Sequence, residues 1–156
     1  MSFLSCEEML AAARSQNISL SEAILRSDLA ESRLTEAHSR EMMHHLWQVM
    51  QATSRDYDPA QRSRSGLSGG DAAKVNAAAV RGVLYADGYF ADVMAEAPKT
   101  AECNACMKRI VAAPTAGSCG VLPAVLLPVG RIAARLSSRG SGTGTMPEFG
   151  SIVQKG

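Results

Sequence analysis

The sequence predicts a mainly α-helical, packed domain with glycine-rich loops and an irregular C-terminal tail. Hydrophobic residues make up 46% of the 156 residues, which is typical of one globular domain. Aromatic residues make up only 4%, and this scarcity favours closely packed helices over a β-sandwich. Apolar residues also recur at helical spacing along the first third of the chain.

Three helices are expected in that first third. Ser5 is a suitable N-cap for the first helix, because acidic residues follow it in the first turn, where the helix dipole favours them. Asn17 ends this helix. A second, shorter helix is expected over residues 18–29, and a longer one over residues 32–54.

Glycine and proline divide the middle of the chain. Residues 55–68 are polar and contain both breakers, so they are predicted to form a loop. Asp71 is expected to cap a helix over residues 72–86. The next helix is predicted from about residue 98, where a proline suits a first turn, to residue 112, before Pro114.

The last part of the chain has a different composition. Residues 130–156 show no sustained periodicity and include SSRGSGTGTM, which is close to a flexible linker. We therefore expect one folded unit over residues 1–129 and a disordered tail over residues 130–156.

Charge and hydropathy exclude some partners. The formal net charge is +1, so no overall field would recruit nucleic acid or an anionic membrane. The apolar run 121–129 is too short to span a bilayer, and the N-terminus lacks the pattern of a signal peptide. A cytoplasmic location is expected, and four cysteines there would be free thiols or metal ligands.

The segment SGLSGGDAAK, residues 65–74, delivers a glycine loop into a predicted helix N-terminus. Backbone N–H groups at such an end favour anions, so a carboxylate or phosphate could bind there with the hydroxyls of Ser65 and Ser68. The segment lacks the spacing of a Walker A or Rossmann motif. A simple helix-entry loop is an equally good interpretation.

The segment PTAGSCGVLP, residues 114–123, places Cys119 between Gly117 and Gly120. Small residues let backbone approach a ligand closely, and a thiolate there would be a metal ligand or a nucleophile. Thr115 and Ser118 add hydroxyls. The alternative is that Cys119 only fills space in a core.

Two further patterns are weaker. Cys103 and Cys106 have the spacing of a zinc half-site or a redox pair, but no second ligand pair accompanies them, which favours a packing role. His44 and His45 are adjacent on a predicted helix and point about 100° apart, so they could not easily bind one metal.

Taken in order, EAILRSDLAE, SGLSGGDAAK and ECNACMKRIVAAPTAGSCGVLPAVLLP resemble the alpha chain, or alpha domain, of the bacterial iron-sulfur L-serine dehydratase (L-serine ammonia-lyase). The resemblance covers about residues 1–129. It implies conversion of L-serine to pyruvate and ammonia with a 4Fe-4S cluster that three cysteines hold. It also implies a serine dehydratase beta chain as a partner.

The resemblance assigns roles to individual residues. Cys119 matches the first cluster cysteine and is the implied metal ligand. The glycine block would hold the carboxylate of L-serine, and Thr115 would lie at the same site. The implied substrate-binding residues are Ser65, Gly66, Ser68, Gly69, Gly70 and Thr115. The base that removes the α-proton is not identified.

The chain also departs from the family pattern. Residues 102–108 read ECNACMK where the family has EVNAAMG, so Cys103 and Cys106 occupy packing positions. The family continues into an ASISGAEGGCQ-type motif and a further cysteine, and this chain does not. We therefore expect a truncated alpha chain whose cluster site a beta chain or a second alpha-type chain completes, with apolar surface left exposed. The alternative is a non-catalytic helical fragment that only binds a partner.

Overall fold

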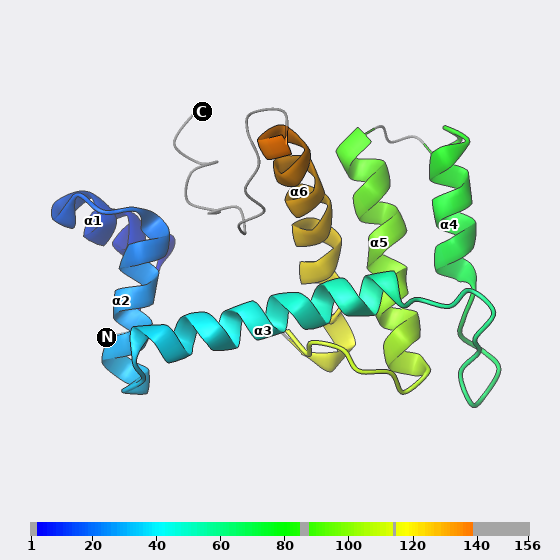
Figure 1. Cartoon of the computed structure of the whole chain (residues 1–156), viewed down its shortest axis with the longest axis horizontal. Helices are drawn as coiled ribbons and strands as arrows, with labels where there is room; N and C mark the ends of the chain where they lie inside the picture. The colour runs from blue at the N-terminus through cyan, green and yellow to red at the C-terminus, as the bar shows by residue number, and fades with distance from the viewer. Residues whose placement is uncertain (1–2, 85–87, 114, 139–156) are drawn as a thin grey trace. The chain divides into compact units, whose positions relative to one another are not determined.

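The computed structural model describes residues 3–84, 88–113 and 115–138 (Figure 1). The fold is mainly α-helical, as predicted: this described part contains six α-helices, one short 3-10 helix and no strand. The chain divides into two compact units, one formed before residue 45 and the other starting at His45. The long helix α3 (Glu36–Arg55) contributes to both units.

The first unit is built on α1 (Cys6–Gln16) and α2 (Leu20–Ser32). Ser5 caps α1 by accepting a hydrogen bond from the backbone N–H of Glu8 at 3.2 Å, which confirms the predicted cap. Ser19 caps α2 in the same way. Asn17 ends α1 in the left-handed conformation, at φ 51°, which asparagine tolerates better than most residues.

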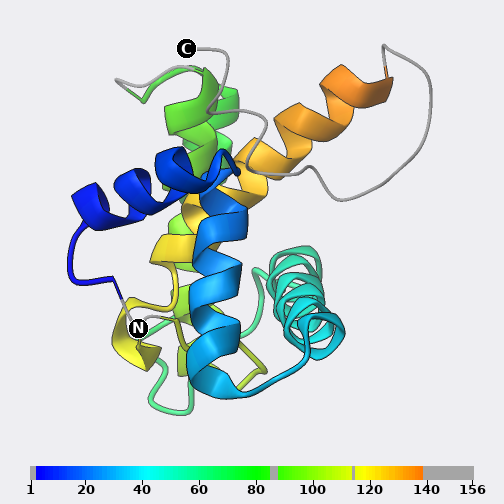
Figure 2. The same cartoon turned by 90° about the vertical axis from the view of Figure 1, so that its left-hand side faces the viewer.

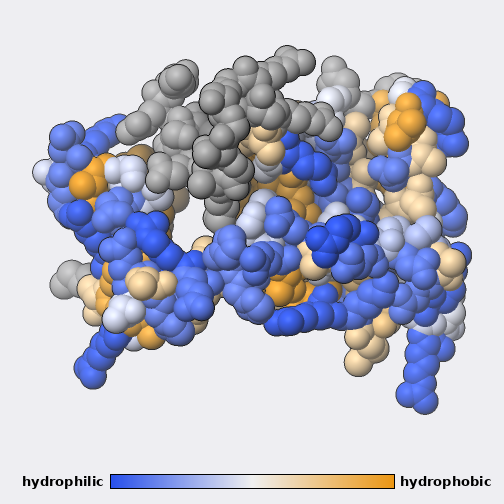
Figure 3. Space-filling view, in the orientation of Figure 1, coloured by the Kyte–Doolittle hydropathy of each residue, from blue (hydrophilic) through white to orange (hydrophobic). Residues whose placement is uncertain are grey.

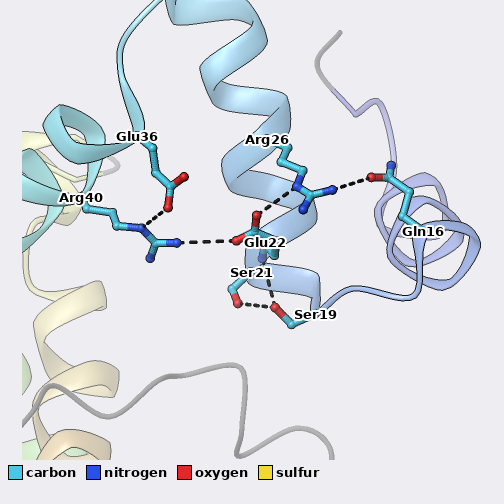
Figure 4. A network of polar contacts seen from close by, with 7 residues as sticks. All are labelled: Gln16, Ser19, Ser21, Glu22, Arg26, Glu36 and Arg40. Carbon is cyan, nitrogen blue, oxygen red and sulfur yellow. Dashed lines mark hydrogen bonds and ion pairs between the residues drawn. The ribbon is translucent and has the colours of Figure 1, made fainter.

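Polar contacts around Glu22 connect the helices of this unit (Figure 4). Its carboxylate accepts a hydrogen bond from Arg26 at 2.9 Å and pairs with Arg40 of α3 at 3.5 Å. Arg26 also donates to the side chain of Gln16 in α1 at 3.3 Å. These groups are partly exposed, so the contacts orient the helices more than they stabilise them.

The second unit contains the rest of α3, α4 (Asp71–Val80), α5 (Gly88–Ala105), the 3-10 helix η1 (Ala116–Ser118) and α6 (Val121–Ser138). Helix α5 packs against α4 and against α6 (Figure 1). Both helices bury small side chains, Ala72 on α4 and Ala91 and Ala95 on α5, and such residues let packed helices approach closely.

The apolar core of this unit lies between α3, α6 and the segment before η1. Met50, Val111 and Leu127 are buried, and Trp47 packs against them. A Cβ at Gly130 would lie 3.0 Å from the Trp47 ring, so glycine makes room on α6 for this ring of α3. Figure 2 views α3 nearly along its axis, and Figure 3 shows that its outward face is mostly hydrophilic.

Several predicted helix boundaries were wrong. Helix α3 begins at Glu36 and not at residue 32, and α4 ends at Val80 and not near residue 86. Helix α5 begins at Gly88 and runs through Pro98, which was expected to start it. The two turns before Pro98 bury alanines, α5 packs against α4 and α6, and this packing outweighs the backbone hydrogen bond that proline cannot donate.

The predicted tail is also helical in its first part. Helix α6 continues to Ser138, so residues 130–138 extend it, and residues 139–156 lie outside the described residues. Exposed valines at positions 121 and 125 give α6 the exposed apolar surface that was expected. None of the helices described here has the length and apolar character needed to cross a membrane.

An ion pair with a buried carboxylate joins α5 to α6. Glu96 is 1% exposed, and its Oε2 atom pairs with Lys99 and with Arg131 of α6, both at 3.2 Å. Among the described residues, its Oε1 atom and the hydroxyl of Thr100 have no hydrogen-bond partner. Buried polar atoms without a partner are uncommon and costly.

Candidate functional site

The glycine-rich segment forms a loop that closes on itself before α4. The backbone N–H of Ser63 donates to the Ser68 carbonyl at 2.8 Å, and the Ser68 N–H donates to the Ser63 hydroxyl at 3.1 Å. The hydroxyls of Ser63 and Ser65 lie 3.2 Å apart. These contacts hold Ser65, Gly66 and Ser68 in one tight turn.

Two glycines bring this loop against the preceding chain. Gly69 and Gly70 have φ values of 134° and 82°, which residues other than glycine rarely adopt. A Cβ at Gly69 would overlap the carbonyl oxygen of Gln61, and one at Gly70 would lie 2.9 Å from the Arg62 guanidinium. The glycines are therefore explained by close packing within the loop.

The amino end of α4 binds a carboxylate that belongs to the chain itself. Glu102, near the end of α5, accepts hydrogen bonds from the backbone N–H groups of Gly70, Asp71 and Ala72 at 2.8, 2.8 and 2.9 Å. The predicted N-cap, Asp71, is instead the first residue of α4, and its side chain pairs with Lys74. The anion-binding geometry that the glycine loop predicted is present, and Glu102 occupies it.

Tyr57 completes the surroundings of this carboxylate. Its hydroxyl donates to Oε2 of Glu102 at 2.6 Å, which is short for an O–H···O bond and typical of a charged acceptor. Burial raises the pKa of Tyr57 to about 12, and the hydrogen bond to Glu102 and the charge of that carboxylate add to the rise. The phenol therefore stays protonated and continues to donate.

Cys119 directly follows η1 and is 1% exposed. Thr115 caps η1: its hydroxyl accepts from the Ser118 N–H at 3.3 Å and lies 2.9 Å from the Ser118 hydroxyl. The side chain of Asn104 donates to the Ala116 carbonyl at 3.2 Å. The cysteine segment is thus fixed to the carboxyl end of α5.

Both predicted segments meet the same end of α5. Glu102 contacts the start of α4, and Asn104, two residues later, contacts η1. Figure 1 shows the glycine loop and η1 at this end of the helix. The structure therefore brings the two motifs to one region, with the last turns of α5 between them.

Cys103 and Cys106 lie where α5 ends, and Cys103 serves the packing role that was favoured. It is buried, with its thiol 3.8 Å from the Thr53 carbonyl, its hydrogen-bond acceptor. Burial raises the pKa of the Cys103 thiol, the Lys108 ammonium opposes that rise, and Cys106, Glu102 and Cys119 add to it. A thiol that resists ionisation is a poor nucleophile or metal ligand.

A narrow pocket opens beside this pair. Its lining includes Tyr57, Glu102, Cys103, Cys106 and Lys108. His45 lies elsewhere, where its Nε2 atom is 2.9 Å from the guanidinium of Arg109. Across residues 3–84, 88–113 and 115–138, no three histidine, cysteine or acidic side chains are grouped so that they could hold a metal ion. The described cysteines therefore do not by themselves form the three-thiol set of a cluster.

Sequence reasoning missed Glu102 and Tyr57. They lie 30 and 15 positions from Ala72, whose surroundings they complete, and no local pattern marks either of them. The one available signal was a helix N-terminus that starts with glycines and so lacks a capping side chain, because its donors need an acceptor from elsewhere.

Known proteins similar to this chain share one description. The family model described as serine dehydratase alpha chain matches residues 15–137. The chain is 31% identical over 127 residues to the probable L-serine dehydratase alpha chain of Bacillus subtilis, covering 81% of this chain and 42% of that protein. It is 30% identical over 121 residues to the L-serine dehydratase alpha chain of Peptoniphilus asaccharolyticus, covering 77% and 41%. The chain thus spans less than half the length of these relatives, and no solved structure matches it.

Proposed function

The chain belongs to the serine dehydratase alpha chain family, as its motifs predicted, and we propose that it forms part of an L-serine ammonia-lyase. The proposed reaction converts L-serine to pyruvate and ammonia. Because the chain covers 42% of its Bacillus relative, the activity of the whole enzyme is proposed for this sequence as one part of it. The proposed partner is a serine dehydratase beta chain or a second alpha-type chain, and the proposed location is the cytoplasm, where thiols stay reduced.

One observation carries the proposal: the glycine loop and the Cys119 segment meet at the carboxyl end of α5. A site for a small amino acid needs polar groups for its carboxylate next to the reacting centre. We propose that Ser65, Gly66, Ser68, Gly69 and Gly70 form the loop side of this site and that Thr115 lies on the cysteine side. The loop contributes hydroxyls and a closely approaching backbone.

We further propose that Cys119 supplies one ligand of a 4Fe-4S cluster. It is a free cysteine in a segment that Thr115 and Gly120 fix in place. Thiolates are the usual ligands of such clusters. Because the described residues provide no set of three ligands, we propose that the remaining ones come from outside these residues.

Anaerobic reconstitution with iron and sulfide tests this function. The chain is mixed with the beta chain of a related enzyme, and iron content, the visible absorption of the cluster and pyruvate formed from L-serine are measured. We expect all three to appear in the mixture. Failure to form pyruvate in a mixture that holds a cluster would contradict the assigned reaction.

Matched cysteine variants test the ligand. Cys119→Ser is expected to lose the cluster absorption, because a serine hydroxyl is a poor ligand for iron. Cys6→Ser changes an exposed cysteine of the first unit and is expected to keep it. Equal iron content in the two variants would show that Cys119 is not a ligand.

A further inference from the structure

We propose that Glu102 is a positioning residue for the glycine loop, and that its carboxylate fills the anion site of α4 in place of the substrate. The role of the loop in holding L-serine rests on the proposed function. The contact between Glu102 and α4 does not, because it is a feature of the fold itself.

The carboxylate is bound as an anionic ligand would be. Its Oε1 atom accepts from the N–H groups of Asp71 and Ala72, and its Oε2 atom accepts from the Gly70 N–H and the Tyr57 hydroxyl. All four distances lie between 2.6 and 2.9 Å. Consecutive backbone donors at a helix amino end are a strong site for a negative charge.

The side chains at the start of α4 itself do not accept these hydrogen bonds. Gly70 is the N-cap of α4 and has no side chain with which to cap it, and the Asp71 carboxylate pairs with Lys74 at 2.7 Å. Ala72 is fully buried in the intact protein, where its N–H donates to Glu102. The start of α4, and the loop that leads into it, therefore depend on a residue of α5.

The position of Glu102 limits which groups of the glycine loop could bind the carboxylate of a substrate. Because Glu102 already satisfies the N–H groups of residues 70–72, the carboxylate of L-serine would contact the hydroxyls of Ser65 and Ser68 instead. Glu102 is also two residues from Asn104, which holds η1. The same turn of α5 thus sets the glycine loop and the Cys119 segment relative to each other.

Amide hydrogen exchange measured by NMR tests the positioning role in the full chain. Glu102→Gln keeps the size of the side chain but replaces one accepting oxygen with a donor. We expect exchange at residues 70–72 and in the 63–68 loop to become about tenfold faster or more, because bonds to a charged acceptor are lost. Amides of α6 are expected to keep their protection.

Asp92→Asn is the matched control, since it removes an exposed carboxylate from the same helix. It should leave every loop amide unchanged. If Glu102→Gln also leaves the loop amides unchanged, Glu102 does not position the loop. If Glu102→Gln fails to fold, Tyr57→Phe replaces it: this variant removes one bond to Oε2, and faster exchange is expected at Gly70 than at Ala72. No change at Gly70 would contradict the proposal.

Formate tests whether the site is specific for a carboxylate. Glu102→Ala removes the carboxylate and leaves the donors of α4 without an acceptor. Sodium formate is expected to restore protection of the loop amides with a saturating dose response, and sodium chloride at the same ionic strength is not. Equal effects of the two salts would contradict a carboxylate site.

Kinetics separate this inference from the proposed function. In a mixture that turns over L-serine, Glu102→Gln should raise KM about tenfold or more and change kcat less, because the loop that binds substrate is displaced. A larger loss in kcat than in KM would contradict a role in positioning the substrate loop. A wild-type mixture without activity would contradict the proposed reaction, while hydrogen exchange would still decide the role of Glu102.

Discussion

A Cβ atom at Gly120 would lie 2.5 Å from the carbonyl oxygen of Ala97, so only glycine fits where the Cys119 segment passes α5. Both sides of this contact are backbone, so no flexible side chain can move away to make room. This contact explains the glycine that follows the cysteine, independently of any ligand.

Gly120→Ala is therefore expected to destabilise the second unit by about 1–3 kcal/mol, the range for overpacking a tight contact. Gly117→Ala is the matched control, because a Cβ there would meet only the Thr115 hydroxyl oxygen, at 3.9 Å. Urea unfolding followed by circular dichroism measures both. Equal stability of the two variants would show that the segment can move away from α5 without cost.

Local signals predicted the helical class and the first caps, because these depend on neighbours in sequence. Helix α1 begins after Ser5 and ends before Asn17 as expected, since an N-cap and a left-handed C-cap residue act within one turn. Pro98 was misassigned as a helix start because packing of α5 against α4 overrides local preference. Glu102 was missed because nothing in the sequence shows which distant carboxylate will reach the amino end of α4.

The hydroxyl of Thr100 gives a second prediction. Thr100 is 1% exposed and its Oγ1 atom has no partner among the described residues, so the nearly isosteric Thr100→Val removes a buried, unsatisfied group. We expect stability to stay equal or to rise by up to about 1 kcal/mol.

Thr53→Val is the opposite case, because the Thr53 hydroxyl donates to the carbonyls of Val49 and Arg109 at 2.8 and 3.0 Å. It should lose about 1–2 kcal/mol. Thermal unfolding of both variants provides the comparison. A loss in Thr100→Val as large as in Thr53→Val would mean that an unseen group satisfies Thr100.

The buried pair between Glu96 and Arg131 gives a third prediction. Glu96 is 1% exposed, so removing a cation from it leaves a buried negative charge less compensated. Arg131→Met is expected to cost about 1–3 kcal/mol, less than the roughly 3–5 kcal/mol for a sole buried partner, because Lys99 still pairs with Glu96. Arg26→Met breaks the partly exposed pair with Glu22 and should cost less than about 1 kcal/mol. Chemical unfolding measures both, and an equal cost would contradict the burial argument.

The bond between Tyr57 and Glu102 predicts a loss of stability at high pH. The pKa of Tyr57 is about 12 in the folded protein against 10.0 for an ordinary tyrosine. Between these values the unfolded chain releases a proton that the folded chain keeps, so the unfolded state binds fewer protons and stability falls as pH rises. The contribution is complete below pH 10 and is lost by about pH 12.

Tyr57→Phe cannot titrate, so the stability difference between wild type and this variant should be constant below pH 10 and shrink between pH 10 and 12. The expected change is about 1–3 kcal/mol, the scale of a hydrogen bond to a charged group. Urea unfolding at a series of pH values measures it. Glu102→Gln should make the change smaller, because the hydrogen bond and the charge that raise the pKa are gone. A difference that stays constant to pH 12 would show that Glu102 does not hold the Tyr57 proton.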